Sequence, residues 1–305
     1  MAEAVPVILD VDTGVDDALA IALAVSSPRV DLVAVTTLAG NVDVDRTTAN
    51  TLAVLDWLGA DSVPVHRGAS RPLARPHVDA AFVHGTDGLG NAGLPPSPRG
   101  VGADRGPAAI IRLASARPGQ LTLVCVGPLT NLAIALNVEP TLPSLLAGVV
   151  VMGGAYRVPG NVTPRAEFNI YCDPEAAAQV LATPFPRLTL IGLDVTEQVV
   201  LSRAAWTAAA DGNGPVAGLV DRIGRRAFVE RGLAGTALHD PLALAAAVEP
   251  SLVAGESAGV TVGTEGEARG ETRLDGAGSA VVASTVDPGA ALRFLSRELG
   301  LPSLI

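Results

Sequence analysis

Four aspartates crowd the segment that follows the first apolar run of the chain. Residues 5–11 are apolar apart from Asp10, and Asp12, Asp16 and Asp17 follow within the next six positions. Side chains two apart on a strand point to one face, and the first turn of a following helix begins at the same edge, so all four carboxylates can reach one small volume. Like charges that close raise one another's pKa unless a cation neutralises them, and an all-oxygen set favours Ca²⁺ or Mg²⁺. The spacing therefore predicts a hard-cation site at the carboxyl end of a strand, the edge at which open α/β sheets bind ligands.

Two other interpretations of this segment stay open on the residues alone. The two helix-start aspartates could simply complement the helix dipole, with Thr13 or Asp12 as the N-cap, although this leaves Asp10 unexplained. The DxD spacing also fits a phosphatase of the haloacid dehalogenase type, with Asp10 as nucleophile and Asp12 as acid/base. An EF-hand is excluded, because the twelfth position counted from Asp10 is Ile21 rather than Glu.

Composition narrows the class of protein further. The 305 residues carry a net charge of −10, and all 21 basic residues are arginines. This excludes lysine-based chemistry and argues against nucleic-acid binding, which needs a basic surface. The uncharged stretch 120–138 contains Gly127 and Pro128, so it predicts a strand, a turn and a helix rather than a membrane span. Residues 1–6 lack the features of a secretory signal, and the two cysteines lack disulfide or zinc spacing. We therefore expect a cytoplasmic protein that binds neither membrane nor nucleic acid.

The apolar pattern predicts one α/β domain over residues 1–305, with no linker that divides it. Short apolar runs alternate with helix-length segments, which indicates a largely parallel sheet flanked by helices. The predicted strands are 5–11, 31–38, 121–126, 148–152, 187–193 and 280–286. The predicted helices are 16–26, 44–58, 107–116, 129–137, 174–181, two or more within 203–231, 241–248 and 288–299. Segments 259–264 and 268–274 predict a hairpin at the sheet edge. The long loops 67–106 and 153–169 are expected to form binding walls or lids.

Seven dispersed motifs, added to the aspartate segment, resemble the calcium-dependent nucleoside hydrolases of the inosine-uridine-preferring type. The segment from Asp10 to Ala18 reads DVDTGVDDA and is similar to the metal motif of that family. The other matching motifs, in family order, are Gly40-Asn41, Val126-Gly127-Pro128-Leu129-Thr130-Asn131, Met152-Gly153-Gly154, Gly160-Asn161, Ala166-Glu167-Phe168-Asn169, Asp173-Pro174-Glu175-Ala176 and His239-Asp240-Pro241. The resemblance implies a Rossmann-like core with a mainly helical C-terminal part, a ribonucleoside N-ribohydrolase activity that releases ribose and a free base, and a homo-oligomer, dimeric or tetrameric.

The resemblance also implies roles for individual residues. Asp12, Asp17, Asp240 and the backbone carbonyl of Val126 would hold one Ca²⁺ per subunit, with Asp10 beside them. Asp12 would also act as general base on the attacking water, and His239 as the acid that assists the leaving base, since its ordinary pKa lies near neutrality. The residues assigned to the substrate are Asp16, Asn41 and Asn169 at the ribose hydroxyls, Asn161 and Glu167 at the 5′-hydroxyl, Phe168 in the same motif, and His84 near the base.

The sequence departs from the family pattern mainly around the base. Thr13 stands where many members have proline. Segment 222–238 contains one aromatic residue, Phe228, where members often carry several, so the preference for purines or pyrimidines stays open. We expect the arginines of this segment to solvate a helix face, and Trp57 and Trp206 to be core residues. Because so few aromatic residues surround the base, a second function stays open: a module that binds nucleosides without efficient turnover.

Overall fold

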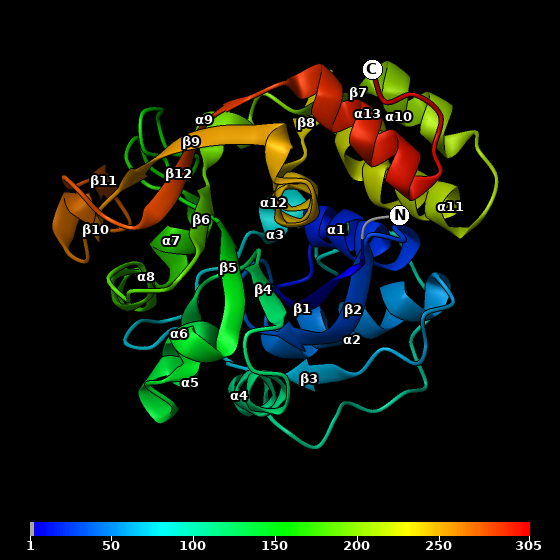
Figure 1. Ribbon diagram of the computed structural model, residues 1–305. Coiled ribbons are helices and arrows are strands. Elements are labelled where there is room, and N and C mark those ends of the chain that lie inside the picture. The colour runs from blue at the N-terminus through cyan, green and yellow to red at the C-terminus, as the bar shows by residue number, and fades with distance from the viewer. Residues whose placement is uncertain (1–2) are drawn as a thin grey trace.

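The computed structural model describes residues 3–305. The strands of its central sheet are β1 (Val5–Val11), β2 (Val30–Thr37), β3 (Val65–Arg67), β4 (Leu121–Cys125), β5 (Leu146–Met152), β6 (Leu188–Ile191), β9 (Val253–Ala258) and β12 (Ala280–Val286). They lie in the order β3-β2-β1-β4-β5-β6-β12-β9 (Figure 1). Every pairing is parallel except that of β9 with β12. The mostly parallel sheet predicted from the sequence is thus confirmed.

Helices cover both faces of this sheet (Figure 1). One face is covered by α1 (Val15–Ser26), α2 (Val44–Trp57), α12 (His239–Val248) and α13 (Pro288–Leu299), with α10 (Arg203–Ala210) and α11 (Pro215–Arg225) beyond them. The opposite face is covered by α4 (Gly106–Ala116), α5 (Thr130–Val138), α6 (Leu142–Leu145) and α8 (Pro174–Leu181). The remaining helical segments are α3 (Ala81–His84), α7 (Phe168–Cys172), α9 (Leu193–Thr196), the π-helix η1 (Arg226–Glu230) and the 3₁₀ turns η2 (Pro250–Leu252) and η3 (Gly266–Ala268).

The alternation of side chains along β1 divides the interior into two cores. Val7, Leu9 and Val11 pack with the helices of the α1 face, whereas Ile8 packs with those of the α4 face. Successive strand residues point to opposite faces, so Asp10 shares the face of Ile8. A strand buried on both sides must be apolar throughout, and a fully buried carboxylate at its end is therefore conspicuous.

The predicted edge hairpin forms, but it does not lie at the sheet edge. Its strands, β10 (Val260–Val262) and β11 (Thr272–Leu274), pair with each other in a separate sheet. Gly259 ends β9, and its backbone pairs with Gly276 and Asp275, which turns the chain away from the main sheet. The edge position belongs instead to β9, whose largely exposed residues carry no apolar run by which the sequence could reveal a strand. A second two-stranded pair, β7 (Val200–Ser202) with β8 (Gly235–Ala237), was not predicted.

The long loop 67–106 is fastened to the body of the protein at several points and carries α3 to the carboxyl edge of the sheet. The backbone N–H of Leu73 donates to Asp173, Arg75 pairs with Glu175 at 2.6 Å, and His77 Nε2 lies 2.8 Å from the carbonyl oxygen of Gly40. These contacts fix a segment that is otherwise almost free of regular structure. The loop therefore forms a wall of the region above the sheet, as expected from its length.

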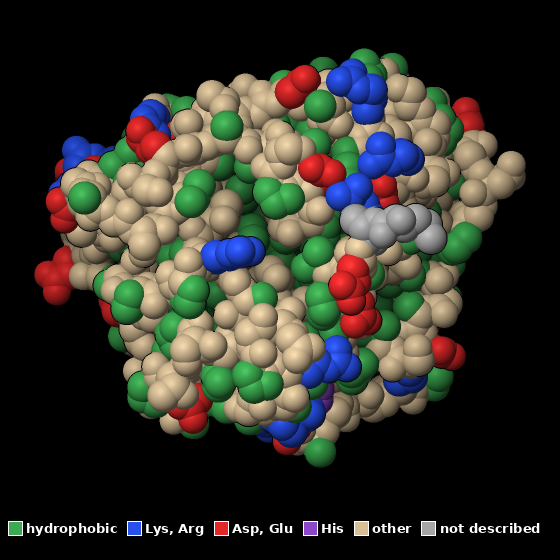
Figure 2. Space-filling view, viewed as in Figure 1, with side chains coloured by type: hydrophobic (Ala, Val, Ile, Leu, Met, Phe, Trp, Pro, Cys, Tyr) green, Lys and Arg blue, Asp and Glu red, His purple; other side chains and the backbone are tan. Residues whose placement is uncertain are grey.

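Helix length and the distribution of charge on one face can be read from the described part of the chain. No helix in residues 3–305 combines the length and the apolar character that crossing a bilayer requires. On the face seen in Figure 2, arginines and acidic side chains are interspersed rather than separated into patches.

Candidate active site

The turn from β1 into α1 places the first carboxylates of the site. The side chain of Asp17 accepts the backbone N–H groups of Asp12 (3.1 Å) and Gly14 (2.9 Å), so it caps the start of α1 from within. The N-cap position is held by Gly14, and the Thr13 hydroxyl bonds to that of Thr51. Neither Thr13 nor Asp12 is the N-cap, so that alternative is wrong, although Asp17 does stabilise the helix start.

Asp12 lies beneath this turn and is completely buried. Its Oδ2 accepts the backbone N–H of Asn41 at 2.7 Å, whereas its Oδ1 is buried without a hydrogen-bond partner among the described residues. Two glycines make room for the carboxylate: a Cβ at Gly127 would lie 2.6 Å from Oδ1, and a Cβ at Gly40 would collide with Oδ2. A buried carboxylate oxygen without a donor is costly, so this atom is a strong indication of an absent cation or water.

Asp16 connects two segments that lie far apart in the sequence. Its Oδ2 accepts the backbone N–H of Asp240 at 2.9 Å, across 224 residues of sequence. This bond ties the first turn of α1 to the first turn of α12. It brings the fourth predicted ligand residue, Asp240, against the N-terminal cluster.

The carboxylates repel one another in a dry environment. Burial raises the pKa of Asp16 to about 7. Burial, followed by the charge of Asp17, raises the pKa of Asp12 well above its ordinary value. The pKa of Asp240 is raised by burial and then by the charges of Asp16, Asp17 and Asp12. A group of acids in this state ionises together only if a positive charge is supplied.

The donor set fits a hard divalent cation. It consists of carboxylate oxygens together with the carbonyl oxygen of Val126, which accepts Asn169 Nδ2 at 2.8 Å. Within residues 3–305, no three Asp, Glu, His or Cys side chains are already arranged around one point as metal ligands. The oxygens of Asp17 face backbone amides instead. A cation here would therefore depend on oxygen atoms beyond these carboxylates to complete its coordination.

Asp10 belongs to a separate buried network behind the cluster. Its Oδ1 accepts the Thr36 hydroxyl at 2.5 Å and Asn131 Nδ2 at 2.7 Å, and burial raises its pKa to about 7. Asn131 in turn binds the carbonyl of Thr37, so the network links the ends of β1, β2 and α5. A nucleophile must reach its substrate, but Asp10 is completely buried and is not part of the cavity wall described below. This placement argues against the phosphatase alternative.

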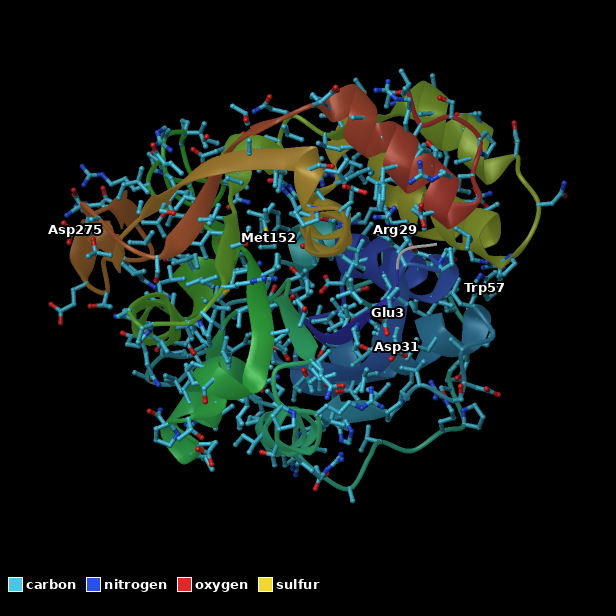
Figure 3. All side chains as sticks on the ribbon, viewed as in Figure 1. Glu3, Arg29, Asp31, Trp57, Met152 and Asp275 are labelled. Atoms are coloured by element: carbon cyan, nitrogen blue, oxygen red, sulfur yellow. The ribbon has the colours of Figure 1, made fainter. Side chains whose placement is uncertain are left out.

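A cavity of about 300 Å³ opens above the cluster. Ten of the residues predicted for the site line it: Asp16, Asn41, His84, Val126, Asn161, Glu167, Phe168, Asn169, His239 and Asp240. Asp10, Asp12 and Asp17 are not part of its wall but are buried beneath it. Met152 also lines the cavity, and Figure 3 shows it at the end of β5 close to α12. The structure thus gathers residues from eight separate segments of the sequence.

The predicted ribose-binding residues are held rigidly by the backbone. Asn41 Nδ2 bonds to the Asp12 carbonyl and to Asp17, and Asn169 Nδ2 reaches the carbonyls of Val126 and Met152. Because both amide nitrogens are engaged by protein acceptors, each side chain has a fixed orientation.

Glu167 and Asn161, the residues predicted to bind the 5′-hydroxyl group, bond to the backbone at the start of α7. The carboxylate of Glu167 accepts the backbone N–H groups of Gly154, Asn169 and Ile170, which makes it the N-cap of that helix. Asn161 Oδ1 accepts the N–H of Phe168 at 2.9 Å. Both residues therefore stabilise the start of α7, in addition to the substrate contact that the resemblance implies.

The two predicted histidines approach each other at the cavity. His84 Nδ1 accepts the backbone N–H of Val15 at 3.1 Å, an approach that a side chain at Gly14 would block. His239 Nδ1 lies 2.7 Å from the hydroxyl of Thr196. Burial lowers the pKa of both imidazoles to about 4, and the charge of His239 adds to the effect on His84. With pKa values lowered this far from the ordinary value, both rings are neutral at pH 7.

Three cavity residues were given only other roles from the sequence. Trp206 is a buried core residue, as expected, but it also lines the cavity and stacks on Phe228 with 5.0 Å between ring centroids. Arg226 and Arg231, expected to solvate a helix face, also line it. Arg226 begins the π-helix η1, an irregularity common at functional sites that no sequence pattern predicts. Trp57 is half-buried away from the site, with Arg222 stacked 5.0 Å from its ring.

Comparison with known proteins assigns this fold and site to a class of glycosidic hydrolases. A family model described as "Inosine-uridine preferring nucleoside hydrolase" matches residues 7–293, and the chain belongs to that family. It is 42% identical over 279 residues to the pyrimidine-specific ribonucleoside hydrolase RihA of Shewanella woodyi, with 88% of each chain covered. It is 36% identical over 274 residues to uridine nucleosidase 1 of Arabidopsis thaliana, covering 88% of this chain and 81% of the relative.

A solved structure with the same fold is the purine-preferring ribonucleoside hydrolase from Gardnerella vaginalis. It superimposes with a TM-score of 0.91 at 35% identity and covers 98% of this chain and 100% of that one. The protein is thus an enzyme that hydrolyses the N-glycosidic bond of ribonucleosides, and its family is generally metal-dependent. Neither the phosphatase nor the binding module is favoured. Relatives named for pyrimidine and for purine substrates occur side by side.

Proposed function

We propose that this nucleoside hydrolase uses one Ca²⁺ per subunit, held by Asp12, Asp17, Asp240 and the Val126 carbonyl oxygen. The observation that carries the proposal is the buried group of carboxylates beneath the cavity, whose pKa values are raised by burial and mutual repulsion. The cation would neutralise these charges, fix the ribose diol and lower the pKa of the attacking water. The unpartnered Oδ1 of Asp12 supports this assignment.

The residues around the proposed cation site would accept the proton from water and orient the substrate. Cleavage of an N-ribosidic bond passes through a sugar with oxocarbenium character, so the ribose must be held beside negative charge while water attacks. Asp12 accepts the proton from that water. Asp16, Asn41 and Asn169 orient the ribose hydroxyls, and their fixed side chains reduce the entropy lost on binding. Asn161, Glu167 and Phe168 enclose the 5′ end.

The leaving base meets the two histidines. Because burial keeps both imidazoles neutral, they assist departure by donating an N–H hydrogen bond to the base rather than by transferring a proton from an imidazolium. His84 is fixed as a donor through Nε2, since its Nδ1 accepts from Val15. His239 is the second donor.

The decisive experiment measures base release from uridine, cytidine, inosine and adenosine and from their 2′-deoxy forms, with and without a calcium chelator. We expect cleavage of ribosides that the chelator abolishes and that Ca²⁺ restores, with deoxyribosides cleaved at least 100-fold more slowly. Asp240→Asn should lose the Ca²⁺ dependence together with the activity. Asp275→Asn, at an exposed position directly after β11 (Figure 3), is the matched control and should behave as wild type. Chelator-resistant cleavage would contradict the metal assignment.

Three further properties belong to this proposal. We treat residues 1–305 as one nucleoside-hydrolase domain, which the match over residues 7–293 supports. We place the enzyme in the cytoplasm, supported by Cys125 and Cys172, both free and buried. The family resemblance supports a homo-oligomer, dimeric or tetrameric. Sedimentation of the purified chain tests this last point, and a single monomeric species would refute it.

A further inference from the structure

The cavity has two chemically different ends. Its polar end is built at the carboxyl edge of the sheet by Asp16, Asn41, Asn169 and Asp240. Its other end is built by α10, α11, η1 and the β7–β8 pair. Apolar side chains dominate there: Leu201, Trp206, Val220, Ile223, Phe228 and Leu233. If ribose occupies the polar end, as proposed above, the base extends into the apolar end.

Two of the polar side chains at the apolar end, those of Trp206 and Arg226, are engaged within the protein, and Arg231 and Thr236 complete its polar lining. Trp206 Nε1 donates to the carbonyl of Val220 at 2.9 Å, so the indole offers a base only its carbon surface. The guanidinium of Arg226 donates to the carbonyls of Phe82 and Val83 and pairs with Glu230. Those bonds anchor α3 to η1 and use the donors that could otherwise read a base edge.

The apolar surface continues to the mouth of the cavity. Phe82 and Val162 line the cavity although 73% and 41% of their surfaces are exposed. They come from the two long loops, 67–106 and 153–169, on different walls. Exposed apolar side chains that continue the wall of a cavity form a contiguous patch, and such patches mark surfaces that contact a ligand.

We propose that this enzyme selects its base by shape and apolar contact, and that its substrates include ribonucleosides whose base carries an apolar substituent. The inference rests on the proposed function. An apolar wall gains affinity from each buried methylene, about fourfold for one CH₂ moved out of water. The same wall discriminates against a hydroxyl in that position, because the hydroxyl loses water without gaining a partner.

The test compares substrates that match in size and differ in polarity. For pyrimidines the pair is 5-ethyluridine and 5-hydroxymethyluridine, and for purines it is N6-propyladenosine and N6-(2-hydroxyethyl)adenosine. We expect kcat/KM for the alkyl member to equal or exceed that of the parent nucleoside and to exceed that of its hydroxyl partner on the order of tenfold. Equal values within each pair, or alkyl substrates more than tenfold poorer than the parent, would overturn the inference.

Variants at the apolar end show whether the wall sets the preference for alkyl over hydroxyl substrates, apart from general effects on the rate. Leu233→Asn places an amide in the wall and should reduce the alkyl-to-hydroxyl ratio by about tenfold. Thr236→Val, in the same part of the wall, removes a hydroxyl at constant size and should keep or increase that ratio. Val229→Asn is the matched control: it lies on η1, is 63% exposed and is not a cavity residue, so the ratio should not change. An alkyl-to-hydroxyl ratio that is unchanged in Leu233→Asn, or reduced in Thr236→Val, would contradict the inference.

Failure of this inference is distinguishable from failure of the proposed function. If uridine, cytidine, inosine and adenosine all release no base, the proposed function fails. Titration calorimetry of the same matched pairs then still tests the wall through binding alone. Tighter binding of the alkyl member, reduced in Leu233→Asn, would support it, and equal binding would overturn it.

Discussion

One hydroxyl group fixes the imidazole of His239, which we propose faces the leaving base. Thr196 is completely buried, and its Oγ1 lies 2.7 Å from His239 Nδ1. The bond sets the plane of the ring and leaves Nε2 as the nitrogen available to a substrate. Because the ring is neutral, catalysis depends on which nitrogen carries the proton, and Thr196 acts as a positioning residue.

We expect Thr196→Val to lower kcat about tenfold or more with little change in KM, the loss corresponding to about one hydrogen bond. Thr196→Ser keeps the hydroxyl and should recover most of the rate. Steady-state kinetics of both variants check this. A serine variant no better than valine would show that Thr196 contributes packing rather than orientation.

A second residue-scale feature is the space that glycine leaves around Asp12. A Cβ at Gly40 would collide with the Asp12 carboxylate. We expect Gly40→Ala to displace that carboxylate and to weaken Ca²⁺ binding at least tenfold, measured by calorimetry on the metal-free protein. Gly100→Ala is the matched control, since nothing lies within 4 Å of its added Cβ. Unchanged Ca²⁺ affinity in Gly40→Ala would contradict the role given to Asp12.

At the scale of elements, helix starts serve two separate purposes. Asp43 caps α2 by accepting the backbone N–H groups of Asp45 and Arg46, and it lies on the exposed surface. Asp16 accepts the backbone N–H of Asp240 and so joins the starts of α1 and α12 at the cavity. The first cap stabilises a helix, whereas the second also positions a proposed metal ligand.

This difference predicts opposite signatures for two aspartate variants. Asp43→Ala should lower the free energy of unfolding by about 1 kcal/mol, the usual value of an N-cap, with unchanged kcat/KM. Asp16→Ala should reduce kcat/KM by at least 100-fold, because it removes a ribose contact and releases Asp240. Denaturant unfolding and kinetics on both variants give the comparison. If the Asp16→Ala enzyme kept nearly wild-type activity, the bond between Asp16 and Asp240 would not be needed for catalysis.

At the scale of the whole molecule, the carboxylate cluster makes stability depend on pH in an unusual direction. Folding raises the pKa of Asp10 and of Asp16 from 3.8 to about 7, and it also raises those of Asp12, Asp17 and Asp240. Above pH 4 the folded protein therefore retains protons that the unfolded chain has released. The retained protons add to the free energy of unfolding. This added stability is fully present below about pH 4 and is lost as the pH rises through the pKa values of the folded protein.

We therefore expect the metal-free protein to unfold at a temperature several degrees higher at pH 5 than at pH 8. Ca²⁺ binds the ionised carboxylates, so its stabilising effect should be larger at pH 8 than at pH 5. Thermal unfolding at both pH values, with and without Ca²⁺, checks both statements. Asp240→Asn should show a smaller pH dependence. A metal-free protein that becomes more stable from pH 5 to pH 8 would contradict the burial of these acids in a charged cluster.

The sequence by itself determined most of the framework. Apolar strands buried on both faces and helices with clear boundaries are local patterns, and β1, β12, α8 and α13 begin and end where predicted. The aspartates after β1 were recognisable because four acids in eight positions need a common explanation. Strand β9 was not predictable, because an exposed edge strand lacks the periodicity that burial imposes on a sequence.

Only the tertiary structure decided how these residues act together. The bond from Asp240 to Asp16, the burial that neutralises His84 and His239, and the place of Trp206 on the cavity wall all join segments far apart in the chain. Spacing along a sequence carries no information about such contacts, because solvent exposure and the approach of distant backbone are set by packing. Residue types therefore indicated the chemistry, and packing set the protonation states and the apolar character of one end of the cavity.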